Sequence, residues 1–279
     1  MIASGDRTRT PGLWSVVAFE LRKLAAQRRS WITLLATVVL PFVLVAVLQG
    51  QARPPKDTLF GRFIHESGWS IPLLLLGFAG QWFLPLLTSI VAGDIFASED
   101  QHGTWKTVLT RSVSRTQLFF GKTVVAVGFA LVAYLLLGAC TIAASVLIIG
   151  HQPLSGLGGQ MIPSGDAARL VVESWAAVAA PLIGFTGLAM MLSVLTRNVA
   201  AGIAAPVALG LVMQLVGAVG GLDAVRPLLL TTPLETWHGL FATPHFTGPL
   251  QFGLAVSAAW SITTITIAYV VFRRRDYQG

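Results

Sequence analysis

Long apolar runs dominate the sequence, and short segments that carry most of the charged residues separate them. Each run has about 18 residues or more, which is the length that a helix needs to cross roughly 30 Å of hydrocarbon. The runs are continuous and lack the alternation of apolar and polar positions that is typical of transmembrane β-strands. The pattern therefore predicts an all-α membrane protein with six transmembrane helices in one domain, 1–279, at about 31–48, 71–93, 119–149, 170–195, 199–220 and 251–272.

The segment that precedes the first run, 12–30, has two faces at helical spacing. Its apolar face holds Trp14, Val17, Leu21 and Leu24, and its polar face holds Glu20, Lys23 and Gln27. An amphipathic helix of this kind lies in the membrane interface with its apolar side towards the lipid. We predict such an interfacial helix here; the alternative is an ordinary basic N-terminal tail.

Composition and charge agree with a membrane protein and give it an orientation. Hydrophobic residues make up 54% of the chain, charged residues make up 11%, and mean hydropathy is +0.72, which excludes a soluble enzyme or a disordered tail. With the N-terminus inside, fourteen of the 19 Lys and Arg lie on the cytoplasmic side and five lie outside, as the positive-inside rule requires. We therefore expect a multi-pass protein of the plasma (inner) membrane with both termini cytoplasmic. The net charge of +7 is explained by contact with anionic membrane lipids and needs no nucleic acid.

Motifs of nucleotide binding and hydrolysis are missing from the sequence. Gly121, Lys122 and Thr123 look like the end of a phosphate-binding loop, but Thr116 stands where the first glycine is required. The motifs H-E-x-x-H and G-x-S-x-G do not occur, and the five histidines lack the spacing of metal ligands. We expect no enzyme activity, cofactor or metal on this chain.

The apolar runs contain uncharged polar residues and helix-disturbing residues. Gln81 lies four residues before Pro85, and the proline ring leaves the Gln81 carbonyl without its helical donor. These features serve either close helix packing or a substrate pathway. The candidate pathway residues are Gln81, Pro85, Thr88, Gly210 and Gln214. The absence of charges from the middle of the runs, and of a visible repeat, disfavours an ion-coupled carrier.

The two long outer connections differ. Segment 150–166 is rich in Gly and Pro and predicts a flexible loop. Between the fifth and sixth runs, Thr232, Pro233 and Glu235 have the spacing of an N-cap, a first-turn proline and a capping box. We expect short re-entrant helices there, at 232–242, which are too short to span the membrane. Their apolar face, a candidate outer gate, holds Leu234, Trp237 and Phe241.

The inner connection 94–118 predicts a second short helix. Gly103 breaks the preceding helix and Thr104 is placed to cap a new one. The apolar face of this new helix holds Trp105, Val108 and Leu109. A helix of about two turns is not stable alone, so it must dock on the membrane or on a partner. Ser114 and Gln117 then form a capping box at the start of the third run.

These motifs, taken together, resemble the type-2 family of ATP-binding-cassette transporter permeases (ABC-2). The residues that carry the resemblance are Glu99, Gly103-Thr104, Ser114-Arg115 and Gly121-Lys122 in that order, preceded by Phe19-Glu20 and Lys23 in the amphipathic segment. The six runs and the structured segment before the last run are also similar to the family, so the resemblance covers essentially the whole chain.

The resemblance implies a permease that works with separate ATP-binding-cassette ATPase subunits and a second permease copy or paralogue. ATP and Mg would be bound on the ATPase. The residues expected to couple this chain to the ATPase are Glu99, Gly103, Thr104, Trp105, Val108, Leu109 and Arg115. The expected cargo is an amphipathic compound that is drug-like, lipid-like or peptide-like and is exported. The alternative is a non-transporting membrane anchor or sensor that recruits an ATPase through the same loop.

Overall fold

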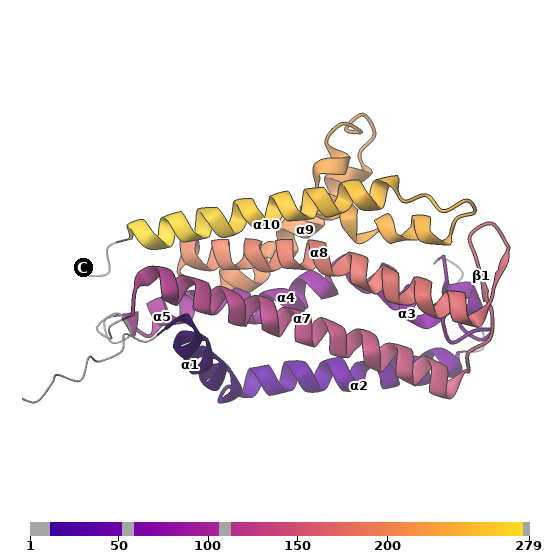
Figure 1. Ribbon diagram of the computed structural model, residues 1–279, viewed down its shortest axis with the longest axis horizontal. Helices are drawn as coiled ribbons and strands as arrows, with labels where there is room; N and C mark the ends of the chain where they lie inside the picture. The colour runs from indigo at the N-terminus through magenta and orange to yellow at the C-terminus, as the bar shows by residue number, and fades with distance from the viewer. Residues whose placement is uncertain (1–11, 52–58, 106–112, 276–279) are drawn as a thin grey trace, which may run out of the picture.

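The computed structural model describes residues 12–51, 59–105 and 113–275, and it is an elongated bundle of helices (Figure 1). The helices are α1 (Leu13–Ala25), α2 (Arg28–Gly50), α3 (Ser70–Gly80), α4 (Phe83–Ala92), α5 (Ala97–Gln101), α7 (Arg115–Ile148), α8 (Ser164–Thr196), α9 (Val199–Ala218) and α10 (Gly248–Arg274). The short elements are β1 (Leu154–Ser155), β2 (Met161–Ile162) and the 3-10 turns η1 (Gly61–Phe63), η2 (Arg226–Leu228), η3 (Thr232–Leu234) and η4 (Thr236–Phe241).

Within the described residues, five helices are long and apolar enough to cross a membrane, namely α2, α7, α8, α9 and α10. The helices α3 and α4 pass the same test as a pair but are bent by 64°. The all-α membrane architecture is therefore confirmed, and the count reaches six if this bent pair is one span. The end of the molecule that holds α1, α5 and the end of α10 is the predicted cytoplasmic side, and we call it the inner end (Figure 1).

The bend between α3 and α4 falls within the predicted span 71–93, next to the Gln81 carbonyl that we expected Pro85 to leave free. Pro85 has no N–H group, so it cannot donate to the Gln81 carbonyl. The side-chain amide of Gln214 on α9 donates to this carbonyl instead, at 2.9 Å. The break is thus stabilised by a neighbouring helix, as membrane helices require when a backbone group is freed.

The helix α8 lies at the centre of the bundle and packs along α10, α4 and α9 (Figure 1). Glycines permit the closest crossings: a Cβ atom on Gly187 would lie 2.4 Å from the Thr264 hydroxyl of α10. Likewise, a Cβ atom on Gly93 would lie 2.4 Å from the backbone of Gly202 on α9. Small residues at such crossings let helices pack without help from the hydrophobic effect, which is absent in lipid.

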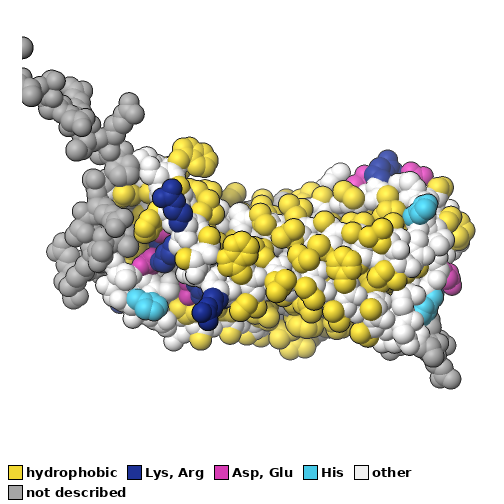
Figure 2. Space-filling view, turned by 90° about the horizontal axis from the view of Figure 1, so that it is seen from below, with side chains coloured by type: hydrophobic (Ala, Val, Ile, Leu, Met, Phe, Trp, Pro, Cys, Tyr) yellow, Lys and Arg dark blue, Asp and Glu magenta, His cyan; other side chains and the backbone are white. Residues whose placement is uncertain are grey.

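The face of the bundle shown in Figure 2 carries a broad apolar zone, with charged side chains gathered towards its two ends. The helix α1 crosses the inner end, and the predicted helix at 12–30 is confirmed over Leu13–Ala25. Its expected faces are only partly right. Trp14 is 75% exposed, but Val17 and Glu20 are both buried against the bundle, so part of the polar face points inward.

Two expectations for the outer end are wrong. Segment 150–166 contains an antiparallel pair, β1 with β2, where we expected only a flexible loop. Segment 232–242 forms 3-10 turns and not an α-helix started by a capping box. The hydroxyl of Thr232 donates to the Arg226 carbonyl, and the Glu235 carboxylate accepts from the Gln81 amide, so neither side chain caps this segment.

Candidate functional site

The site at the inner end is built where α1 crosses α7. The crossing point is Gly121, where a Cβ atom would lie 2.6 Å from Cγ1 of Val16. Valine is stiff at this position because its side chain is branched at Cβ. Gly121 therefore lets α1 approach closely, and the next residue along α7, Lys122, comes within reach of Glu20.

Four charged side chains meet at this crossing, and we call them the inner charge cluster: Glu20 and Lys23 of α1, Glu99 of α5 and Lys122 of α7. The Lys122 ammonium lies 2.9 Å from the Glu20 carboxylate and donates to the Glu99 carboxylate at 3.0 Å. Lys23 donates to the same Glu99 oxygen. Two carboxylates and two ammonium groups give a formal charge of zero.

Three of the four side chains of the inner charge cluster are buried, and Lys23 is half-buried. Lys122 is fully covered, and Glu20 and Glu99 are nearly so. Burial alone would raise the pKa of Glu99, but the charge of Lys122 and hydrogen bonds from Lys23, Thr104 and Lys122 outweigh it and lower this pKa to about 2. Glu99 is therefore ionised at neutral pH. Breaking a buried pair by removing one partner is costly, because it leaves an uncompensated charge away from water.

A tight turn closes the loop over Glu99. Gly103 has a φ of 62°, in the left-handed region, and ends α5 as predicted. The Thr104 amide donates to the Glu99 carbonyl at 3.0 Å, and its hydroxyl donates to the Glu99 carboxylate. The described bonds of Thr104 thus point back to α5, and the expected capping of a following helix is not among them.

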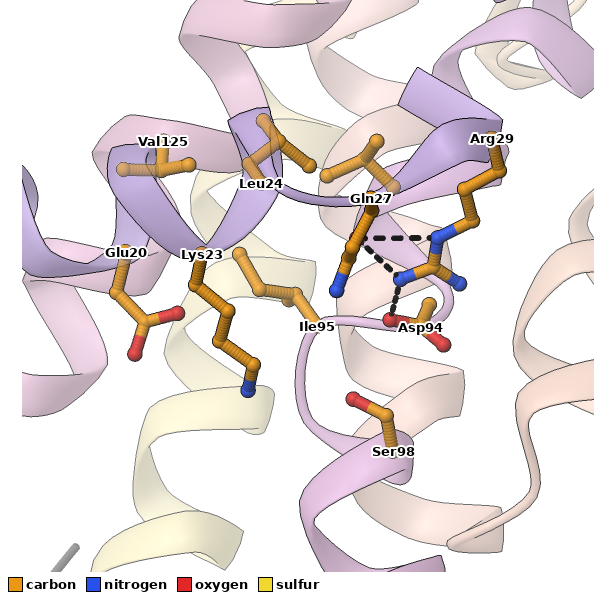
Figure 3. A pocket seen from close by; sticks show the side chains of 10 residues that line it. Glu20, Lys23, Leu24, Gln27, Arg29, Asp94, Ile95, Ser98 and Val125 are labelled. Carbon is orange, nitrogen blue, oxygen red and sulfur yellow. Dashed lines mark hydrogen bonds and ion pairs between the residues drawn. The ribbon is translucent and has the colours of Figure 1, made fainter. Parts of the chain in front are cut away.

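A second ionic contact lies beside the cluster (Figure 3). Arg29 at the start of α2 donates to Asp94, which follows α4, and also to the side chain of Gln27. Glu20, Lys23 and Asp94 line a small cavity of about 20 Å³ next to these groups. The cavity is polar and large enough for about one water molecule. Span ends α2 and α4 are therefore joined directly at the inner end.

Trp105 packs against other residues of this chain. Its side chain is only 5% exposed, and its ring centroid lies 5.3 Å from that of Phe272 on α10. The Lys122 ammonium lies 5.9 Å from the Trp105 ring. Trp105 therefore anchors the loop to this chain's own core, and its expected contact with an ATPase subunit stays a prediction. Val108 and Leu109 lie outside the described residues.

Arg115 ties the end of the last span to this loop. Its guanidinium donates to the carbonyls of Arg273 and Arg275, at 3.1 and 2.7 Å, so it satisfies the exposed carbonyls at the end of α10. Arg275 in turn contacts the Asp100 carboxylate at 3.1 Å. The predicted capping box of Ser114 and Gln117 is confirmed at the start of α7. Burial raises the pKa of Asp100, although Arg275 opposes this effect.

The predicted coupling residues therefore fall into two groups. Glu99, Thr104 and Trp105 surround Lys122, whereas Arg115 lies at the end of α10. The sequence pattern did not predict that Glu20, Lys23 and Lys122 meet in one cluster with Glu99. The signal was present, because all three belong to motifs of the family resemblance, and Lys122 is a cation near the start of an apolar run.

The candidate pathway residues also fall into two groups, because only two of the five line a pocket. Gln81 and Gln214 line a pocket of about 540 Å³ towards the outer end, together with Arg226, Thr232 and Glu235. Its apolar lining comes from α9 and includes Leu211, Met213 and Leu215. Pro85, Thr88 and Gly210 are not part of this lining. Thr88 donates to the Pro85 carbonyl within α4, and Gly210 packs against the Phe185 ring.

The outer apolar residues are buried as expected. Leu234, Trp237 and Phe241 are covered, and the ring centroids of Trp237 and Phe241 lie 5.9 and 5.2 Å from that of Phe60. Burial lowers the pKa of the adjacent His238, against the opposing effect of Glu235. Within the described part of the chain, no three His, Cys, Asp or Glu residues gather as a metal site would require.

Comparison with known proteins agrees with this arrangement. A family profile described as "ABC-2 family transporter protein" matches residues 16–217. The match begins in α1 and reaches almost to the end of α9, so it contains the whole inner charge cluster. No curated protein matches the chain. Because the profile covers well over half of the sequence, the chain belongs to the ABC-2 family of transporter proteins.

Proposed function

We propose that this permease subunit exports an amphipathic compound, using ATP that is hydrolysed on separate ATPase subunits. It would act with a second permease copy or paralogue. The observation that carries the proposal is the inner charge cluster, because it fixes the loop after α4 to neighbouring helices, so that a force on the loop would move these helices with it. The loop is held by α1 through Lys23, by α7 through Lys122 and by its own turn through Thr104.

The loop at 99–111 is the proposed contact with the ATPase, with Val108 and Leu109 as contact residues. A push on this loop reaches α7 and α1 through Glu99 and Lys122. It also reaches α10, because Trp105 packs on Phe272 and Asp100 pairs with Arg275. One displacement is thereby shared among several spans, which is what switching a pathway between its two sides requires.

The outer pocket is the proposed cargo site. Its polar groups, Gln81, Gln214 and Glu235, lie beside the apolar side chains of α9. This mixture suits a molecule with one polar end and one apolar end. The proposed outer gate, formed by Leu234, Trp237 and Phe241, belongs to the same connection as Glu235, so movement of η3 and η4 would act on both.

The test is reconstitution of the chain with an ATP-binding-cassette ATPase subunit, which is sought first in the adjacent reading frames. Three probes cover the cargo classes: a cationic amphipathic dye, a fluorescent phospholipid and a hydrophobic peptide. We expect at least one probe to stimulate ATP hydrolysis and to accumulate on the outer side. An assembled complex that hydrolyses ATP but neither responds to nor moves any probe would favour the anchor or sensor.

Cross-linking tests the contact separately. In a Cys140→Ala background, Val108→Cys or Leu109→Cys should capture the ATPase. Leu254→Cys, on the exposed part of α10 towards the outer end, is the matched control and should not. Equal capture at all positions would remove the loop from the coupling mechanism.

A further inference from the structure

A second pocket at the inner end lies away from the inner charge cluster and from the outer pocket. The ends of α8 and α10 line it, it is open to the surface, and its volume is about 350 Å³. Three of its lining residues are arginines, namely Arg197, Arg274 and Arg275. The others are apolar, and none of the described residues that line it is acidic.

Two of the three arginines of this pocket are not neutralised. Arg275 pairs with Asp100, but no ion pair joins Arg197 or Arg274 to an acidic side chain within the described part of the chain. Both side chains are exposed. The ends of two helices supply some negative potential, but this is about half a charge each and is shared with the neighbouring basic residues. The pocket therefore keeps a positive charge that a ligand can use.

Arg197 is held in place by its backbone. It caps α8 with a φ of 55°, the only left-handed residue other than glycine in the described chain. The next residue, Asn198, caps α9 by accepting from the Ala201 amide at 3.1 Å. Two helices thus fix the turn, and they direct Arg197 to the pocket at the cost of a conformation that L residues seldom adopt.

The apolar lining identifies the ligand class. Leu195 and Val270 are both partly exposed beside the arginines, and on a membrane protein such side chains face lipid. Guanidinium groups bind phosphate in a bidentate geometry, and basic pockets between spans on the cytoplasmic side suit anionic headgroups. We propose that this pocket binds an anionic phospholipid of the inner leaflet, with its phosphate on Arg197 and Arg274 and its acyl chains along Leu195 and Val270.

Binding is tested on the purified full chain by native mass spectrometry. Phosphatidylglycerol and phosphatidylcholine with identical acyl chains are the probes, each with and without millimolar inorganic phosphate. The variant R197Q/R274Q removes the two unpaired arginines. The matched control R22Q/R28Q removes the same charge from two exposed arginines at the inner end, outside the pocket.

We expect the wild-type chain to retain one phosphatidylglycerol in preference to phosphatidylcholine. R197Q/R274Q should weaken this binding about tenfold or more, and R22Q/R28Q should weaken it clearly less. Equal losses in the two variants would mean general attraction to an anionic surface and would overturn the site. Equal binding of both lipids, or displacement by inorganic phosphate, would also overturn it, the latter by indicating a soluble anion.

A folding control keeps the result interpretable. If R197Q/R274Q lowers the midpoint of thermal unfolding, the single variant R274Q at the end of α10 replaces it. R274Q should still weaken phosphatidylglycerol binding about fivefold. R197K/R274K keeps both charges but loses the bidentate geometry, so it should lie between wild type and R197Q/R274Q.

Discussion

At the scale of single residues, Lys122 is the most consequential side chain that the structure adds to the site. It is fully buried and neutralises both Glu20 and Glu99. Lys122→Met should therefore lower the free energy of unfolding by roughly 3 kcal/mol, because the two carboxylates lose their shared cation. Thermal unfolding of the purified chain measures this.

The companion variants separate charge from packing. Glu20→Gln in the Lys122→Met background removes one stranded carboxylate and should recover part of the loss. Arg28→Met, at an exposed position, should change the unfolding midpoint little. If Lys122→Met were as stable as wild type, the inner charge cluster would not be holding the loop.

The pKa of Glu99 makes the same site sensitive to acid. Its folded pKa is about 2, against an ordinary value of 4.5, so the unfolded chain binds the proton more tightly. The stabilisation is complete above pH 4.5 and is lost as the pH falls from 4.5 towards 2. It amounts to about 3 kcal/mol at neutral pH. Unfolding midpoints at pH 7 and pH 3 should differ more for wild type than for Glu99→Gln, and equal differences would contradict this assignment.

At the scale of elements, local spacing predicted much of the fold. The apolar runs, the Ser114 and Gln117 capping box and the break near Gln81 each depend on residues within about one helical turn. Tertiary contacts decided the rest. Glu20 faces the bundle because its ion-pair partner, Lys122, lies on α7. Trp105 is buried because it packs against Phe272 of α10. These partners are distant in sequence, so the spacing of residues within α1 or within the loop could not predict them.

Gly121 offers a test of how α1 is held. Gly121→Ala places a methyl group where only 2.6 Å separates it from Val16, so α1 must shift and the contact of Glu20 with Lys122 must lengthen. We expect a loss of about 1 to 3 kcal/mol in unfolding free energy. Gly128→Ala in the same helix is the control, because nothing lies within 4 Å of its added Cβ. Alanine there should be neutral or slightly stabilising.

A second substitution checks the cause. Val16→Ala removes the Cγ1 atom that the new methyl group would meet, so Gly121→Ala should cost less stability in the Val16→Ala background than in wild type. Equal behaviour of Gly121→Ala and Gly128→Ala would show that α1 does not depend on this close approach.

At the scale of the whole molecule, the inner charge cluster and the outer pocket lie towards opposite ends of the bundle. Substitutions in the two places should therefore change the stimulation of ATP hydrolysis in different ways. Glu99→Gln weakens the contacts of the loop with Lys23 and Lys122, so it should reduce the stimulation of ATP hydrolysis by every amphipathic probe. Glu235→Gln removes the pocket's only described carboxylate and leaves Arg226. It should therefore weaken stimulation by a cationic dye by roughly tenfold and leave a neutral probe of similar size nearly unaffected.

Both variants should still assemble with the ATPase, because neither alters Val108 or Leu109, and co-purification measures this directly. Loss of response to all probes in Glu235→Gln would place that carboxylate in the switching machinery and not in the cargo site. A loss of response to only some probes in Glu99→Gln would place the inner charge cluster in the recognition of cargo and not in energy coupling. The contrast between a general and a selective defect, measured on the same reconstituted complex, therefore assigns energy coupling to one end of the bundle and cargo choice to the other.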